Sequence, residues 1–93
     1  MSAMHTIIRY EIEWPAKVPV SPEGDMLSDE IEWRREYRST LCAARSRAQR
    51  TCHWGDVKVA YVTREVYRGH DTHPSNTDWR WTRDTPSREE FCA

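Results

Sequence analysis

Glycine is scarce in this 93-residue chain, which holds three, and long apolar runs are missing. Three glycines are too few for a glycine-rich loop that cradles phosphate, and no Gly-x-Ser-x-Gly motif of a hydrolase nucleophile is present. Apolar runs are no longer than that of residues 59–62, whereas a membrane-spanning helix needs about 20 residues. We therefore expect a single small domain over residues 1–93 that does not bind a membrane.

An excess of charge of one sign is also missing, because 14 basic residues balance 15 acidic ones to a net charge of -1. Such a chain has no long-range field that attracts nucleic acid. The first residues contain neither the basic nor the apolar region of a secretion signal. Three cysteines form one disulfide at most, which is too few for a disulfide scaffold. We therefore predict a cytoplasmic protein in which Cys42, Cys52 and Cys92 are reduced.

The amino-acid usage is biased. Twelve arginines accompany two lysines, and five tryptophans accompany a single phenylalanine and a single asparagine. Because arginine codons are rich in G and C, this usage indicates a GC-rich genome. Together with the short length, the composition resembles in style that of the short accessory proteins of actinobacterial phages. That resemblance implies a small phage-type protein that modulates a host protein.

Apolar residues alternate with polar ones near the N-terminus. Over residues 5–14, every second position from Ile8 to Trp14 is apolar, and the positions between them are mostly charged. A period of two is typical of a strand with one buried face. Pro15 is expected to end this strand, because proline has no N–H to donate to a neighbouring strand. The prolines of residues 15–27 then predict an irregular connection.

Residues 28–50 are predicted to form one long helix. Ser28 is a suitable N-cap, and two acidic residues follow it in the first turn. At about 100° per residue, apolar side chains fall along one side of the segment. The stripe contains Trp33, Tyr37, Leu41, Ala44 and Ala48. Arg34 and Arg38 lie on its flank.

Two further strands are predicted, at residues 57–67 and 79–83. A turn-rich stretch at 69–78 separates them, and a capping box at 87–90 predicts a short helical turn near the end of the chain. The expected order is therefore β-α-β-β. It predicts an α+β, two-layer fold in which one long helix packs on a small, mostly antiparallel sheet.

Cysteine and histidine are poorly placed for chemistry. Cys52 and His53 are adjacent, and adjacent residues of a strand point to opposite sides. They therefore suit neither a thiol–imidazole pair nor half of a zinc site. His70 and His73 lie in the turn-rich stretch without a Cys-x2-Cys pair, and we interpret them as solvated. We predict no catalytic residue, no metal site and no cofactor, and hence no enzyme.

Tryptophan is the residue type that points to a function. A domain with one helix and three strands has few fully buried positions, and we expect Trp14 and Trp33 to fill them. Trp79 and Trp81 are expected to share one face of an edge strand. Tryptophan and arginine dominate the energetics of protein interfaces. The predicted partner-binding residues are Trp79, Arg80, Trp81, Arg83, Arg34 and Arg38.

We therefore predict a protein-binding module that covers a site on its partner. An edge strand also allows pairing with a second copy, so a homodimer is a further expectation. The contrasting interpretation of Trp79 and Trp81 is that they cover the open side of the sheet and serve stability alone. The alternative function is nucleic-acid binding by the arginine-rich helix and the Trp/Arg strand, because bases stack on indole and guanidinium planes. The net charge of -1 makes this the less expected function.

Overall fold

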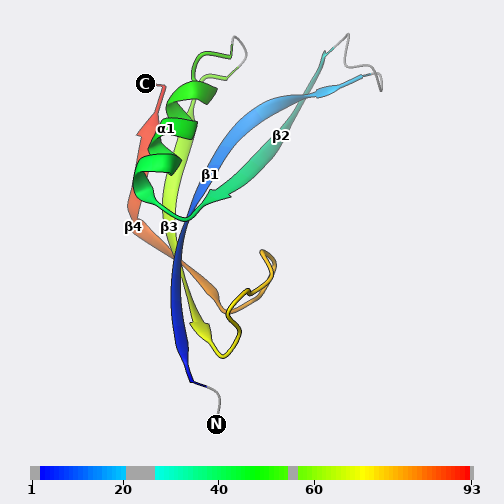
Figure 1. Ribbon diagram of the computed structural model, residues 1–93. Coiled ribbons are helices and arrows are strands. Elements are labelled where there is room, and N and C mark those ends of the chain that lie inside the picture. Colours follow the sequence, from blue (N-terminus) through cyan, green and yellow to red (C-terminus); the bar gives the residue numbers. More distant parts are fainter. Residues whose placement is uncertain (1–2, 21–26, 55–56, 93) are drawn as a thin grey trace.

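The structure is a computed structural model, and it describes residues 3–20, 27–54 and 57–92 of the chain. The elements in chain order are β1 (His5–Pro19), β2 (Leu27–Arg38), α1 (Leu41–Thr51), β3 (Ala60–Gly69) and β4 (Trp81–Phe91). The four strands form one antiparallel sheet in the order β2-β1-β3-β4, and α1 packs on one of its faces (Figure 1). The predicted α+β class is confirmed, but the order of elements is β-β-α-β-β.

The predicted long helix over residues 28–50 is wrong, because its first half is strand β2. Ile31, Trp33 and Tyr37 fit a period of two as well as a helical stripe, so the pattern was ambiguous. In the structure β1 supplies an antiparallel partner along the whole segment, from Leu27 to Arg38. Pairing with a neighbouring strand thus overrides the local helical preference.

The helix that does form has 11 residues and begins at Leu41. Thr40 is its N-cap, and the Thr40 hydroxyl accepts a hydrogen bond from the backbone N–H of Ala43 at 3.2 Å. Ala44 and Ala48 are fully buried against the sheet. Because these side chains are small, the helix backbone lies close to the strands.

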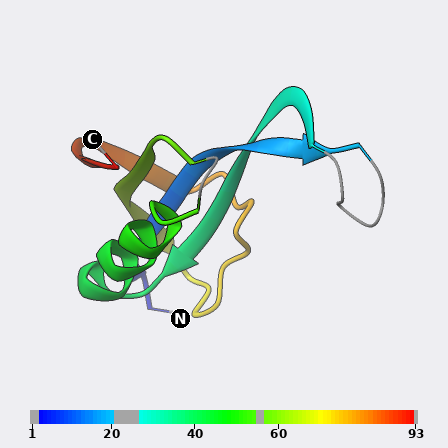
Figure 2. The same cartoon turned by 90° about the horizontal axis from the view of Figure 1, so that it is seen from above.

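Strand β1 continues past Pro15 to Pro19, so the prediction that Pro15 ends it is wrong. The pairing of β1 with β3 ends at Glu13, and from there onward β2 is the only strand that pairs with β1 among the described residues. A proline is tolerated in such an edge position, where one side of the strand has no ladder. The two strands therefore extend beyond the helix and the other strands as a two-stranded arm (Figures 1 and 2). The rest of the predicted connection, residues 21–26, lies outside the described residues.

The last two strands are displaced from their predicted positions. β3 runs from Ala60 to Gly69, and β4 begins at Trp81 but continues to Phe91. The predicted helical turn at residues 87–90 is therefore wrong. The Ser87 hydroxyl accepts a hydrogen bond from the backbone N–H of Arg64 at 2.9 Å, across a bulge in the pairing of β3 with β4. Gly55 and Asp56, whose residue types predict a turn before β3, lie outside the described residues.

The apolar core lies between α1 and one half of the sheet. Its members are mostly small or β-branched: Ile12, Trp14, Ala44, Ala48, Val57, Ala60 and Val62. Trp14 is only 3% exposed, which confirms its predicted place. Trp33 is 46% exposed, so its predicted core position is wrong. Trp33 stacks instead on Tyr61, on the sheet face opposite α1.

A disulfide joins Cys52 and Cys92, so the prediction of three reduced thiols is wrong. It links the end of α1 to the end of β4, two places that are 40 residues apart in sequence. Cys42 is free and exposed. Disulfides are typical of oxidising compartments, whereas the cytoplasm keeps thiols reduced. The predicted cytoplasmic location stays a prediction.

We expect that the double variant Cys52→Ser/Cys92→Ser lowers the free energy of unfolding by about 4 kcal/mol, because the unfolded chain regains the freedom of a long loop. Urea denaturation of the wild type and the variant measures this difference. Cys42→Ser is the matched control and should leave stability unchanged. Three titratable thiols in the native, unreduced protein would contradict the pairing.

A bidentate ion pair joins α1 to β2. Arg47 donates from Nε and Nη2 to the two carboxylate oxygens of Glu36, at 2.6 and 3.0 Å. These hydrogen bonds hold the pKa of Glu36 below its ordinary value. A carboxyl whose pKa is lowered on folding stabilises the fold when ionised, and this contribution is lost as the pH falls through the lowered pKa.

We therefore expect the stability of the wild type to fall with pH below about 4.3, the ordinary pKa of a glutamate. In Glu36→Gln the side chain no longer titrates, so the decline between pH 5 and pH 3 should be shallower. Urea denaturation at several pH values measures both slopes. Equal slopes in the two proteins would show that Glu36 contributes nothing to acid sensitivity.

Candidate functional site

A buried arginine organises the sheet face opposite α1. Arg9 is 8% exposed, and its Nε donates to Glu65 Oε1 at 2.9 Å. Its guanidinium carbon lies 3.8 Å from the ring centroid of Tyr37 and 3.8 Å from that of Trp81. The guanidinium also donates to Asn76, to Oδ1 at 2.7 Å and to the backbone oxygen at 3.1 Å. One side chain thus joins all four strands to the segment between β3 and β4.

A second aromatic cluster lies beside Arg9. Tyr67 is fully buried, its ring centroid lies 5.5 Å from that of Trp81, and Arg80 lies over its face. The Tyr67 hydroxyl accepts a hydrogen bond from the backbone N–H of Asp71 at 3.1 Å. A Cβ atom at residue 69 would lie 2.7 Å from the Tyr67 ring, which is closer than two carbon atoms can pack. The ring fits here because residue 69 is glycine. This cluster is a small second core, built from aromatic rings and guanidinium groups.

The segment between β3 and β4, residues 70–80, is held by this second core. The Trp81 indole Nε1 donates to the Ser75 backbone oxygen at 2.9 Å. The Arg80 backbone N–H donates to Asp78 Oδ1 at 2.9 Å, and hydrogen bonds from Arg80 hold the pKa of Asp78 below its ordinary value. Between these fixed residues Trp79 is 87% exposed. The segment therefore displays one indole from a well-supported turn.

Arg83 has a structural role in the carboxylate cluster of the same sheet face. Glu11, Glu13 and Glu65 are all buried there. Arg83 forms an ion pair with each of them, and Arg35 contacts the first two. These arginines are about half-exposed and cover the carboxylates, so Arg83 neutralises buried charge within the protein.

The predicted site residues do not form one surface. Trp79 and Arg80 precede β4, and Trp81 and Arg83 lie in it, whereas Arg34 and Arg38 lie in β2. In the strand order β2-β1-β3-β4 these two groups occupy opposite edges of the sheet. The predicted second patch on a helix is therefore wrong, because this segment is not helical.

The two groups also differ in what they contact. Trp81 packs on Tyr67 and Arg9, and Trp79 precedes β4, so the prediction that Trp79 and Trp81 share one face of an edge strand is wrong. Arg38 pairs with Glu36. Arg34 is exposed, and no carboxylate of the described residues pairs with it. Trp79 is the predicted anchor that stays most open to solvent.

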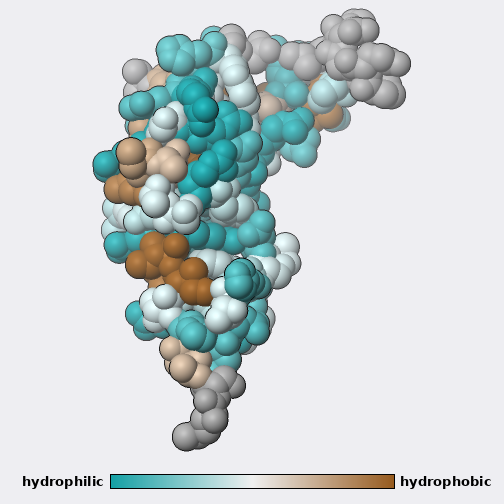
Figure 3. All heavy atoms as spheres, viewed as in Figure 1, coloured by the Kyte–Doolittle hydropathy of each residue, from teal (hydrophilic) through white to brown (hydrophobic). Residues whose placement is uncertain are grey.

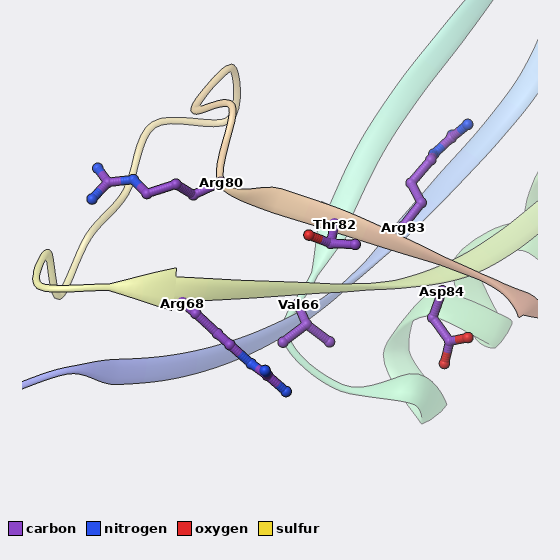
Figure 4. Close-up of a pocket in the computed structure, with 6 residues that line it drawn as sticks. All are labelled: Val66, Arg68, Arg80, Thr82, Arg83 and Asp84. Atoms are coloured by element: carbon purple, nitrogen blue, oxygen red, sulfur yellow. The ribbon is translucent and has the colours of Figure 1, made fainter.

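A hollow of about 360 Å³ lies between β3 and β4, and sequence reasoning did not find it. It is lined by Val66, Arg68, Arg80, Thr82, Arg83 and Asp84. Figure 4 shows that Val66, Arg68 and Asp84 point to one side of the strands, whereas Arg83 points to the other. Val66 and Arg68 alternate along β3, and Thr82 and Asp84 alternate along β4. The two pairs meet only through the register of β3 against β4, which the sequence alone does not reveal.

The residues weighed for catalysis or metal binding are engaged elsewhere. Cys52 is in the disulfide and so offers no thiolate. His70 Nδ1 lies 3.3 Å from the Ala3 backbone oxygen, and His73 Nδ1 lies 3.1 Å from the Thr72 hydroxyl. Over residues 3–20, 27–54 and 57–92, no three His, Cys, Asp or Glu side chains gather in a way that could hold a metal ion. Within the same ranges no helix has the length and apolar character needed to cross a membrane.

Comparison with protein-family models, with curated proteins and with solved structures finds no match to this chain.

We expect Arg9→Ala to lower the free energy of unfolding by about 3–5 kcal/mol, because the buried Glu65 carboxylate loses its hydrogen-bonded partner and keeps only the longer contact with Arg83. The change also removes the contacts with Tyr37, Trp81 and Asn76. Thermal and urea denaturation measure the loss. Arg34→Ala, at an exposed position, is the matched control and should change stability by less than about 0.5 kcal/mol. Equal effects of the two changes would contradict the structural role of Arg9.

Proposed function

We propose that this protein is a non-enzymatic module that binds another protein through Trp79 and the adjoining edge of β4. The exposure of Trp79, 87% on a turn held by several hydrogen bonds, is the observation that carries the proposal. Tryptophan is enriched among the residues that contribute most to interface energies. A turn that is already ordered loses little conformational freedom on binding, which increases affinity.

The outer edge of β4 supports the same proposal. β4 is the last strand of the sheet, and its residues from Trp81 to Asp84 pair regularly with β3 on the inner side only. Such an edge allows an extended segment of a partner to add as a further strand. Between Asp84 and Glu89 the register shifts and the strand contains Pro86, so the continuous usable edge is short. A second copy that paired here would form an equally short ladder.

The mode of action we propose is occlusion, in which a preformed surface covers a site on the partner. The composition, which resembles that of phage accessory proteins, favours a host regulatory or defence protein as that partner. We propose the cytoplasm as the location of the protein, because a host regulatory or defence protein of this kind is expected there. The Cys52–Cys92 disulfide instead favours an oxidising compartment.

Nucleic-acid binding is the second candidate, and the arginine contacts make it the weaker one. Phosphate binding needs guanidinium groups that are free to exchange counterions for phosphate. Among the described residues, nine of the twelve arginines already pair with carboxylates of the protein. The nine are Arg9, Arg35, Arg38, Arg45, Arg47, Arg64, Arg80, Arg83 and Arg88. Most of the basic charge is therefore already neutralised locally.

We expect Trp79→Ala to weaken partner binding by about 30-fold or more, the usual effect at a central interface tryptophan. The partner is first identified by affinity capture from the natural host and then titrated in purified form. Stability should not change, because the indole makes few contacts with its own protein. Trp81→Ala is not a suitable test, because it removes an aromatic ring on which the Arg9 guanidinium packs and so disturbs the fold.

Trp33→Ala is the matched control for this experiment. Trp33 is also an exposed tryptophan, but it lies in β2 at the opposite edge of the sheet. We expect its replacement to leave the affinity for the partner unchanged. Full affinity of Trp79→Ala, or an equal loss in both variants, would overturn the proposed anchor.

A further inference from the structure

The hollow between β3 and β4 lies on the half of the sheet that α1 leaves uncovered. The face that packs against α1 through Ile12 and Val62 continues along the same strands to Ile8 and Val66, which are cross-strand neighbours. Ile8 is 45% exposed, although its place in the alternating pattern predicts burial. Figure 3 shows an apolar patch on this side of the molecule, below the helix. Val66 therefore gives the hollow an apolar wall, and Ile8 lies next to Val66 on β1, outside the lining of the hollow.

The charge in the hollow comes chiefly from Arg68. Arg80 is held by Asp78, and Arg83 points to the other sheet face. Asp84 pairs with Arg64. Arg68 is exposed, and within the described part of the chain no carboxylate lies in ion-pair contact with it. The hollow thus offers one free guanidinium beside an apolar surface.

The spacing of these groups limits the size of a ligand. Val66 and Arg68 are two residues apart on the same face of β3, which places their Cα atoms about 7 Å apart. The volume of about 360 Å³ is near the lower end of the range for small-molecule sites. The hollow therefore suits a group in which a charge and a small apolar part are a few bonds apart.

We infer that this hollow binds a carboxylate that is carried on a short branched aliphatic group. The aliphatic part lies on Val66, and the carboxylate accepts hydrogen bonds from the Arg68 guanidinium, whose planar fork matches two oxygens. A free short-chain acid and the aliphatic C-terminal residue of a peptide share this chemistry. The site goes beyond the protein-binding proposal and does not depend on Trp79.

The test is a titration of the full-length, ¹⁵N-labelled protein followed by NMR. The probes are 4-methylpentanoate, N-acetyl-leucine and N-acetyl-leucine amide. We expect both acids to give saturable shifts at Val66, Arg68 and Thr82, and the uncharged amide to bind about tenfold more weakly or not at all. Tighter binding of N-acetyl-leucine than of 4-methylpentanoate identifies a peptide C-terminus as the source. Equal or tighter binding of 4-methylpentanoate identifies a free acid.

Variants distinguish the site from general surface charge. Arg68→Gln should weaken both acids about tenfold, whereas Arg34→Gln, the same change at another exposed arginine, should have no effect. Trp79→Ala should also leave the affinity for the acids unchanged, so this proposal and the proposed function fail separately. The inference is overturned by the absence of saturable shifts, by equal binding of the amide, or by equal effects of Arg68→Gln and Arg34→Gln.

Discussion

The Arg9 guanidinium, packed between two aromatic rings and paired with Glu65, is the interaction on which the face opposite α1 depends. It contacts Tyr37 of β2, Glu65 of β3 and Trp81 of β4, and it donates two hydrogen bonds to Asn76. A buried charge is stable only when it is paired and its donors are satisfied, and these contacts meet both conditions. The exposed position of Trp79 follows, because the turn that carries this residue is fastened to Arg9.

The composition explains why an arginine has this structural role. The chain has one phenylalanine and few large aliphatic residues, so the apolar core under α1 is small. The other sheet face is stabilised by arginines that stack on aromatic rings and cover buried glutamates. Arginine can do both because its guanidinium is planar and always charged. The same pairing uses most of the basic charge internally.

The sequence predicted the parts of the fold that have a single periodic signal. The alternation from Ile8 to Trp14 gave β1, and the α+β class followed from one helix among several strands. The region of β2 was misassigned because Trp33 and Tyr37 fit both periods, and only the pairing with β1 decides between them. The N-cap Thr40 was the local signal that could have placed the start of the helix.

Long-range pairings account for the rest of what sequence reasoning missed. Nothing local relates Cys52 to Cys92, or Arg9 to Glu65, since each pair is 40 or more residues apart. Of the predicted anchors, Trp79 is exposed as expected, whereas Trp81 and Arg83 are occupied by contacts that only the strand register brings about. The hollow beside Arg68 depends on that register in the same way.

The central claim is that the second core holds residues 70–80 rigidly and so presents Trp79. NMR relaxation of the backbone amides, together with exchange rates of the indole N–H groups, tests it most directly. The account predicts order parameters near those of the sheet, about 0.85, across residues 75–81, with a protected Trp81 indole and a rapidly exchanging Trp79 indole. Order parameters below about 0.6 in this segment, or equally fast exchange of the two indoles, would contradict it.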